Sequence, residues 1–561
     1  MDGTPEPQPH DWGPFGRPLF NDASSRALSR VGVVDVGSNS VRLMVFDGAA
    51  RSPAYFYNEK IMCALGAGMS KTGMLNPEGR MRALAAMRRF RHLADGMGIS
   101  PLTAVATAAV REATDGPEFR AEVESETGIQ LWVIDGEEEA RLSAQGVLLG
   151  WPGSYGLVCD MGGSSMELAE ISGGRVGRRI SAQIGPLKLS GMKGGKKGRK
   201  AFIKQTLSDM AGHMGPQKNR LFLVGGSWRA FARIDMERRG YPLHVLHEYR
   251  MSPAAIRETA KYIADSDPDA LRARASVSSS RMALVPLAAE VLKQVVKTFH
   301  PRDIAISSYG IREGMLYEQM PQQLRDRDPL IESCTYAEAK DARLPGFGRT
   351  LYTFIRPLFK SAPDHRRRIV KAACLLHDVS WRAHPDYRAE DCFDNATRAN
   401  LGGLKHSERV FLGLALLHRY SNKRANARFA PLVSLIDEAS LHQAEVLGKA
   451  MRFGAMLWPQ KDASPGELRW FPKKKHLELR LTPEVEPLFG EVAQTRFQSL
   501  AATLDAQSRV IVPLTAGPFC GLTGTGAPPP SSAAPARIFT ARSRPPAAPV
   551  AAPAPRACGA G

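Results

Sequence analysis

The hydrophobic positions between residues 30 and 320 follow two alternating patterns. Short apolar runs, such as VGVVDV and YGLVCDM, have the length and composition of buried strands. Between them, stretches such as PEGRMRALAAMRRFRHLADGMG carry apolar residues three and four positions apart, which is the spacing of a helix with one buried face. Strands that alternate with helices predict an α/β architecture.

The same patterns extend over most of the chain. The expected strands are VGVVDV, SVRLMVFD, TAVATAAV, IQLWVID, YGLVCDM, MELAEI, RLFLVGG and DIAISSYG. Further helices are expected at EEEARLSAQGVLLG and from Ser278 to about His300. Past residue 325 the strand pattern fades, and helical spacing continues in HRRRIVKAACLLHDVS, SERVFLGLALLHRYSN and SLHQAEVLGKAMRFGAMLW. A mostly helical domain is therefore expected there.

A chain of 561 residues exceeds what one hydrophobic core organises, so several domains are expected. The Pro-rich start and the Ala/Pro-rich end cannot bury enough apolar surface to offset chain entropy. The expected division is 1–28 disordered, 29–142 and 143–322 two α/β domains, 323–514 a helical domain, and 515–561 a disordered tail.

One pattern occurs twice in the α/β region. VVDVGSNSVRLMV at 33–45 recurs as LVCDMGGSSMELA at 157–169, so that Asp35 aligns with Asp160 and Ser40 with Ser165. Each copy by itself is ordinary hairpin chemistry. Two copies, each at the head of an α/β block, predict a duplicated fold in which two hairpins face each other.

The polar residues of these turns suit a phosphate ligand and its counter-ion. Glycines let the backbone approach a ligand, and turn N–H groups with Ser and Asn side chains donate to phosphate oxygens. A carboxylate repels phosphate and is instead expected to hold Mg²⁺ or a metal-bound water. Between the hairpins, Glu137, Glu138 and Glu139 begin a helix, where the helix dipole favours carboxylates. The position of this helix between the two hairpins also suits one of them to activate a water.

The composition favours an anionic partner. The net charge is +19 and the pI about 9.7, which suits nucleic acid, anionic lipid or a phosphate-rich molecule without choosing among them. The stretch GPLKLSGMKGGKKGRKAF predicts a flexible cationic loop, either solvated or following a polyanion, and it lacks the interleaved aromatics of a nucleic-acid site. No apolar run reaches membrane-span length. Scattered cysteines without a CxxC pair predict the reducing cytoplasm.

Together these motifs resemble the Ppx/GppA family, the exopolyphosphatases and guanosine pentaphosphate phosphohydrolases of the actin, Hsp70 and sugar-kinase superfamily. The resemblance is carried by DVGSNS, VATAAVREA, GEEEARL, DMGGSSME, VGGSWRAFA and SSYGIREGMLY. It implies duplicated actin-like (ribonuclease H-like) domains with an interdomain cleft, followed by a mostly helical HD-like domain. It also implies Mg²⁺ or another divalent cation as cofactor.

The resemblance further assigns roles to individual residues. Glu139 matches the family's proposed catalytic base, and Asp160 and Arg111 are the other expected catalytic residues. The expected metal ligands are Asp35, Asp160 and Glu167. The expected phosphate-binding residues are Gly37, Ser38, Asn39, Ser40, Thr107, Gly162, Gly163, Ser165, Gly225, Gly226 and Ser227. The chain departs from the family's motifs at Ser164 and Met166 of the second hairpin and at the bulky Trp228.

The implied reaction is release of terminal orthophosphate from inorganic polyphosphate. The basic composition favours this polymer over guanosine pentaphosphate, for which the sequence offers no identifiable guanine pocket. A non-catalytic polyphosphate or nucleotide binder is a further alternative. We expect no membrane and no sequence-specific nucleic acid as partner, and a homodimer is left open.

The helical third domain carries a second, weaker resemblance. LLHDVS resembles the start of an HD-type metal phosphohydrolase site, with His377 and Asp378 as its first residues. Possible further ligands are His365, His406 and His418. Ala455 stands where such a site has its last Asp. We therefore expect a degenerate HD-like domain that helps to bind substrate or to dimerise.

Overall fold

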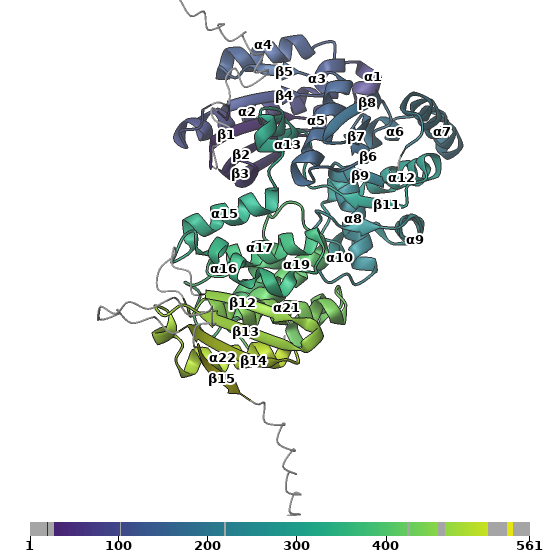
Figure 1. Cartoon of the computed structure of the whole chain (residues 1–561). Coiled ribbons are helices and arrows are strands. Elements are labelled where there is room, and N and C mark those ends of the chain that lie inside the picture. Colours follow the sequence, from purple (N-terminus) through teal and green to yellow (C-terminus); the bar gives the residue numbers. More distant parts are fainter. Residues whose placement is uncertain are drawn as a thin grey trace, which may run out of the picture. The chain divides into compact units, whose positions relative to one another are not determined.

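A computed structural model of the chain describes residues 19–20, 27–100, 102–217, 220–422, 427–457, 466–513 and 536–541 (Figure 1). The chain divides into two compact units, and each is described by itself. The first comprises 1–342, 393–413 and 425–437, and the second comprises 343–392, 414–424 and 438–561. Most of the two terminal segments expected to be disordered lies outside the described residues. The exception in the tail is strand β15 (Ala536–Ala541), to which the sequence analysis assigned no structure.

The first unit begins with a five-stranded sheet in the order β3-β2-β1-β4-β5. Its strands are β1 (Ala27–Val36), β2 (Ser40–Ala49), β3 (Ser52–Met62), β4 (Leu102–Ala106) and β5 (Leu131–Val133). The first three form an antiparallel meander, and β4 and β5 continue the sheet in parallel. Helices α2 (Pro77–Gly96), α3 (Ala108–Glu112) and α4 (Gly116–Thr127) lie in the connections.

A second sheet repeats this order with one added edge strand, as β10-β11-β9-β6-β7-β8. Its strands are β6 (Gly156–Met161), β7 (Met166–Ser172), β8 (Arg175–Ala182), β9 (Arg220–Val224), β10 (Arg250–Met251) and β11 (Asp303–Ile306). Here β6 to β8 form the antiparallel meander, and β9 and β11 run parallel to β6. The same strand order in both sheets confirms the predicted α/β class with duplicated actin-like domains.

Two helices tie the two sheets together within the first unit. Helix α5 (Gly136–Gly150) leads from the first sheet to the second, and α13 (Ile311–Glu318) packs against it. Their contact is so close that a Cβ atom on Gly314 would lie 1.8 Å from the carbonyl oxygen of Leu142. A Cβ atom on Gly146 would similarly lie 2.3 Å from the carbonyl oxygen of Gly310. Glycine at these two positions is therefore what allows α5 and α13 to meet.

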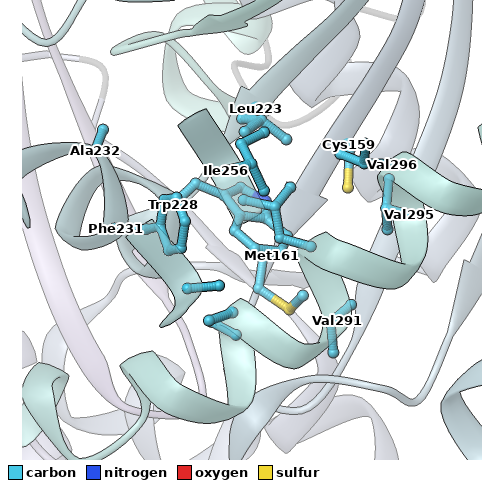
Figure 2. Packing of buried hydrophobic residues seen from close by; sticks show 14 of the residues in the cluster. Cys159, Met161, Leu223, Trp228, Phe231, Ala232, Ile256, Val291, Val295 and Val296 are labelled. Carbon is cyan, nitrogen blue, oxygen red and sulfur yellow. The ribbon is translucent and has the colours of Figure 1, made fainter. Parts of the chain in front are cut away.

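The apolar residues of the second sheet and its helices are buried together in one core, which is why these elements form where the hydrophobic pattern predicts. Buried residues of β6 and β9 pack against helices α7 (Gly195–Met214), α8 (Gly226–Arg238), α9 (Pro253–Asp265) and α12 (Val285–Phe299). Figure 2 shows Trp228 and Phe231 of α8 beside Ile256 of α9 and Met161 of β6. Trp228 is fully buried, so its indole belongs to this core.

Several elements differ from the sequence prediction for physical reasons. Strands β3 and β8 were not predicted, because most of their residues are exposed or only partly buried and they lack the apolar run that marked the others. The segment TAVATAAV is a strand only to residue 106 and then enters α3. The expected flexible cationic loop is instead mostly helical, because α6 (Pro186–Ser190) and the start of α7 cover most of it. Lys196, Lys197 and Lys200 are exposed on α7.

The second unit is built mainly from helices, as predicted, with a four-stranded sheet. The helices include α16 (Phe347–Ile355), α17 (Asp364–Leu376), α21 (Glu438–Gly454) and α22 (Glu491–Thr503). The sheet order is β12-β13-β14-β15, with β12 (Gly466–Phe471), β13 (His476–Leu481) and β14 (Gln507–Pro513). Helix α19 (His406–Tyr420) contributes residues to both units.

Candidate active site

A cavity of about 200 Å³ lies in the first unit, where the two sheets bring their hairpins together. The expected residues that line it are Asp35, Gly37, Ser38, Asn39, Ser40, Thr107, Glu139, Asp160, Gly162, Gly163, Ser165, Gly225, Gly226 and Ser227. Every expected phosphate-binding residue is therefore in one place. Of the expected catalytic and metal-binding residues, Arg111 and Glu167 lie outside the lining.

The two hairpins have the same turn and face each other. In the first, the N–H of Gly37 donates to the carbonyl of Ser40 at 3.1 Å, and in the second Gly162 donates to Ser165 at the same distance. The hydroxyl of Ser164 donates to Ser38 Oγ at 3.3 Å, which joins the tips of the two hairpins. The predicted pair of facing hairpins is confirmed.

The carboxylates of the two hairpins occupy equivalent strand positions with different partners. On the first sheet Asp35 pairs across to Arg42, whereas on the second Asp160 pairs across to Glu167. Asp160 accepts a hydrogen bond from the Ser143 hydroxyl, and burial raises the pKa of this carboxyl. The first hairpin thus presents a cation beside its carboxylate, and the second presents another acid.

Glu139 enters the cavity from the first turns of α5. Helix α5 is capped by Asp135, whose side chain accepts from the N–H of Glu138, so the helix start is fixed. Glu139 is 5% exposed, and its Oε2 atom has no hydrogen-bond partner. Burial, and then the nearby Glu167 and Asp160, raise the pKa of Glu139 well above its usual range. A raised carboxyl pKa in a polar cavity is what a general base requires.

Arg111 contacts Glu139 and does not line the cavity. Its Nη1 donates to the carbonyl of Ile134 at 2.7 Å and lies 3.6 Å from Glu139 Oε2. This geometry therefore supports a role for Arg111 in orienting Glu139, and it does not support direct contact between Arg111 and phosphate.

Glu167 is buried behind the second hairpin. Its Oε1 accepts from the Ser181 hydroxyl at 2.9 Å, and Oε2 has no partner. Burial, followed by the neighbouring Asp160, raises the pKa of Glu167 to about 8. Asp35 and Asp160 therefore remain as the two expected metal ligands that line the cavity.

The glycine motif after β9 forms another wall. Gly225 has a φ of 113°, and a Cβ atom there would lie 2.5 Å from the carbonyl oxygen of Met161. Only glycine can adopt this conformation and let the loop approach the second hairpin so closely. Trp228 of the same motif points into the core (Figure 2) and does not line the cavity.

Basic side chains that the sequence analysis gave no role complete the cavity. They are Arg42, Lys60, Arg229, Arg281 and Arg312. Arg312 is 8% exposed and its Nε has no hydrogen-bond partner. Burial, followed by the neighbouring Arg312, lowers the pKa of Arg42 to about 10. For Lys60, burial and then Arg281, Arg42 and Arg229 lower the pKa to about 8. Cations that disfavour one another's charge in this way form a site suited to a multiply charged anion.

The sequence offered little to identify these five cations. They come from β2, β3, α8, α13 and α11 (Ser279–Met282), so no local spacing connects them. Ser143 was also missed, although it lies four residues after Glu139 and thus on the same helix face. That spacing is the one signal that the sequence did contain.

The residues that line the cavity offer two carboxylates to a magnesium ion. Among the described residues, no group of three or more His, Cys, Asp and Glu side chains is arranged to hold a metal ion by itself. Mg²⁺ commonly uses one or two carboxylates and completes its shell with water and substrate phosphate. Asp35 and Asp160 supply such a pair, and Glu139, whose Oε2 has no hydrogen-bond partner, lines the same cavity.

The HD-like residues of the C-terminal region do not form such a group within the described residues. Asp378 is held by Arg343 through contacts of 2.6 and 2.9 Å. His377 bonds the carbonyl of Cys374 at 2.9 Å, and burial lowers its pKa to about 4. His406 belongs to the first unit, where it contacts the Tyr241 hydroxyl and the carbonyl of His247. His365 is exposed and His418 is buried.

Comparison with known proteins agrees with these motifs. The Ppx/GppA phosphatase family matches residues 44–323, and the C-terminal domain of exopolyphosphatase matches residues 359–511. Retrograde regulation protein 2 of Saccharomyces cerevisiae is 25% identical over 447 residues, which are 71% of this chain and 74% of that protein. Exopolyphosphatase 1 of Mycobacterium tuberculosis is 33% identical over 143 residues, which are 25% of this chain and 42% of that protein.

Solved structures also resemble the chain. The crystal structure of an exopolyphosphatase from Cytophaga hutchinsonii is 24% identical, with a TM-score of 0.48, and the match covers 52% of this chain and 98% of that one. An Aquifex aeolicus member of the Ppx/GppA family is 22% identical, with a TM-score of 0.46 and coverage of 53% and 99%. Separately, none of the helices in the described ranges has the length and apolar character of a membrane span.

Proposed function

The chain belongs to the Ppx/GppA phosphatase family, and on that premise we propose that it is an exopolyphosphatase. It releases terminal orthophosphate from inorganic polyphosphate by metal-assisted attack of water. The observation that carries this proposal is the single cavity in which two phosphate-binding hairpins, a buried glutamate and five basic side chains converge.

The hairpins and the glycine loop hold the terminal phosphate. Ser38, Ser40 and Ser165 line the cavity with hydroxyl groups, and the glycine motif at Gly225 lets backbone approach the ligand. Guanidinium groups give bidentate hydrogen bonds to phosphate oxygens, so Arg42 and Arg312 stabilise the charge of the chain as the bond to the terminal phosphate breaks.

Glu139 accepts the proton of the attacking water. Its Oε2 has no hydrogen-bond partner, which leaves that atom available to a water in the cavity. Arg111, 3.6 Å away, favours the ionised carboxylate that this role needs. The phosphoanhydride oxygen leaves with the remaining chain, and the water oxygen becomes part of the orthophosphate released.

Asp35 and Asp160 would hold the divalent cation, and Ser143 orients Asp160 through its hydrogen bond. Bound there, Mg²⁺ supplies charge neutralisation for phosphate oxygens. Since charge repulsion otherwise keeps a phosphate away from two carboxylates, this ion is also what makes Asp35 and Asp160 compatible with the substrate.

A cytoplasmic location is part of the proposal. None of the described cysteines Cys63, Cys159, Cys334, Cys374 and Cys392 forms a disulfide, and all five are buried. Cysteines that form no disulfide are typical of a reducing compartment.

The proposal is tested by a phosphate-release assay on purified protein. Polyphosphate and guanosine pentaphosphate are compared side by side, with and without Mg²⁺. We expect Mg²⁺-dependent release from polyphosphate at the higher kcat/KM. Faster release from guanosine pentaphosphate would instead identify a guanosine pentaphosphate phosphohydrolase, and binding without release from either substrate would identify a non-catalytic binder.

A further inference from the structure

A second hollow lies in the first unit, on the outer side of the second sheet's helices. It is a groove of about 780 Å³ lined by residues of α7, α9 and α12, and α12 packs against both other helices (Figure 1). Its basic residues are Lys200, Lys204, Arg257, Lys293, Lys297, His300 and Arg302. None of them has a role in the mechanism above.

The positive charge of this groove is not neutralised by the protein. Among the described residues, no ion pair involves any of its six Lys and Arg side chains. The single acid in the lining is Glu290, whose two oxygens accept from Arg199 at 3.0 and 3.1 Å. Glu290 is therefore already neutralised from outside the lining, and the groove keeps an excess of cations.

The floor of the groove belongs to the core beneath it. Ile203, Ile256 and Val296 line the bottom and are buried, and Figure 2 shows Ile256 and Val296 among the core side chains. The lysines and arginines above them are exposed. No Phe, Tyr or Trp side chain lines the groove, and this disfavours a single-stranded nucleic acid, whose bases stack on such rings. Lysines, which predominate here, bind phosphate as point charges without a fixed geometry.

Helix α12 connects this groove with the candidate active site. Leu284, which precedes its first residue, lines the active-site cavity, and Lys293 and Lys297 line the groove. Leu284 and Lys293 are about 14 Å apart along a helix that rises 1.5 Å per residue. An occupant that reaches both places must therefore be long, and a short phosphate chain cannot do so.

We propose that this groove is a second, non-catalytic binding site for the distal part of the polyphosphate chain whose terminal phosphate lies in the active-site cavity. The inference rests on the proposed function, because it takes the substrate to be inorganic polyphosphate. Two sites on one chain raise the effective concentration of the chain end at the cavity. The groove therefore makes the enzyme prefer long chains.

The test is a triple substitution, Lys204→Gln, Lys293→Gln and Lys297→Gln, which removes charge from α7 and α12 without touching the cavity. The matched control carries Lys261→Gln, Lys360→Gln and Lys473→Gln, three exposed lysines outside the groove. For the groove variant we expect KM for long polyphosphate to rise about ten-fold, since simultaneous engagement of both sites is lost. The kcat/KM for tripolyphosphate and all constants of the control are expected to remain at the wild-type values.

An unchanged KM for long chains, or an equal loss with tripolyphosphate, would overturn the proposal. The proposal would also be overturned if the groove variant bound a duplex oligonucleotide more weakly and polyphosphate as tightly as the wild type. The groove would then be a nucleic-acid site. Equilibrium binding of long polyphosphate to the same variants gives a readout independent of turnover. If wild-type protein releases no phosphate from any chain, the proposed function fails, and this binding measurement still decides whether the groove holds the polymer.

Discussion

The Oε2 atom of Glu139 lies 3.6 Å from Nη1 of Arg111. This buried oxygen accepts no hydrogen bond. Burial and the neighbouring acids Glu167, Asp160 and Asp35 raise the pKa of Glu139, and Arg111 opposes them. Arg111 itself is anchored to the carbonyl of Ile134 and does not line the cavity. In the proposed mechanism, Arg111 therefore sets the protonation and orientation of Glu139 and does not bind phosphate.

The first prediction concerns Arg111. Replacement by Gln is expected to lower kcat about ten- to a hundred-fold, a part of the 10²- to 10⁴-fold that general-base catalysis contributes. KM for polyphosphate is expected to stay within about two-fold, because the side chain does not reach the cavity. The pH dependence of kcat should also move to higher pH, since the lost cation favoured the ionised carboxylate. A large rise in KM with kcat unchanged would show that Arg111 binds phosphate instead.

The second prediction concerns Ser143, whose hydroxyl donates to Asp160. In Ser143→Ala we expect the Mg²⁺ concentration for half-maximal activity to rise about 10- to 100-fold, as when other residues that orient a metal ligand are removed. Titration of phosphate release with Mg²⁺ measures this. An unaltered Mg²⁺ requirement with a lower maximal rate would remove Asp160 from the metal-binding residues.

The third prediction is a pH dependence of substrate affinity. The ammonium of Lys60, with a pKa of about 8, is charged below that pH and neutral above it. A bound polyanion favours the charged form, so binding takes up a proton when the pH exceeds 8, and KM should rise by up to about ten-fold per pH unit there. Lys60→Arg keeps its charge over this range and should flatten the rise. A rise of the same size in Lys60→Arg would assign the effect to another group.

The fourth prediction concerns the crossing of α5 and α13, which position Glu139 and Arg312 respectively. Gly314→Ala places a Cβ atom against the carbonyl of Leu142 and is expected to cost about 1 to 3 kcal/mol of the free energy of unfolding, since overpacking a tight contact displaces the backbone. Gly212→Ala is the matched control, because a Cβ atom there meets nothing within 4 Å. That change in α7 should stabilise by up to about 1 kcal/mol. Denaturant unfolding measures the free energy of unfolding of both variants. Equal values for Gly314→Ala and Gly212→Ala would refute the close crossing of α5 and α13.

The sequence was informative wherever chemistry was concentrated in one short segment. The repeated hairpin predicted both turns and their facing arrangement, because each turn is a local structure. It also singled out Gly37 to Ser40, which line the cavity. Strand β3 escaped prediction since its residues are mostly exposed or partly buried. Arg42, Lys60 and Arg312 escaped as well, because only the fold brings them to one cavity. The cationic stretch before residue 202 was taken for a loop, yet its glycines did not prevent α7 from forming.

The most direct test of the central claim is the turnover of Glu139→Gln. Gln keeps the shape of the side chain without a titratable carboxyl, so the variant should fold as well as the wild type. We expect kcat for phosphate release from polyphosphate to fall about 10²- to 10⁴-fold. The dissociation constant for polyphosphate, measured in equilibrium binding, should change less than about two-fold, because the cationic residues remain. Turnover at the wild-type rate would contradict the assignment of Glu139 as the base, and with it the mechanism proposed for this cavity.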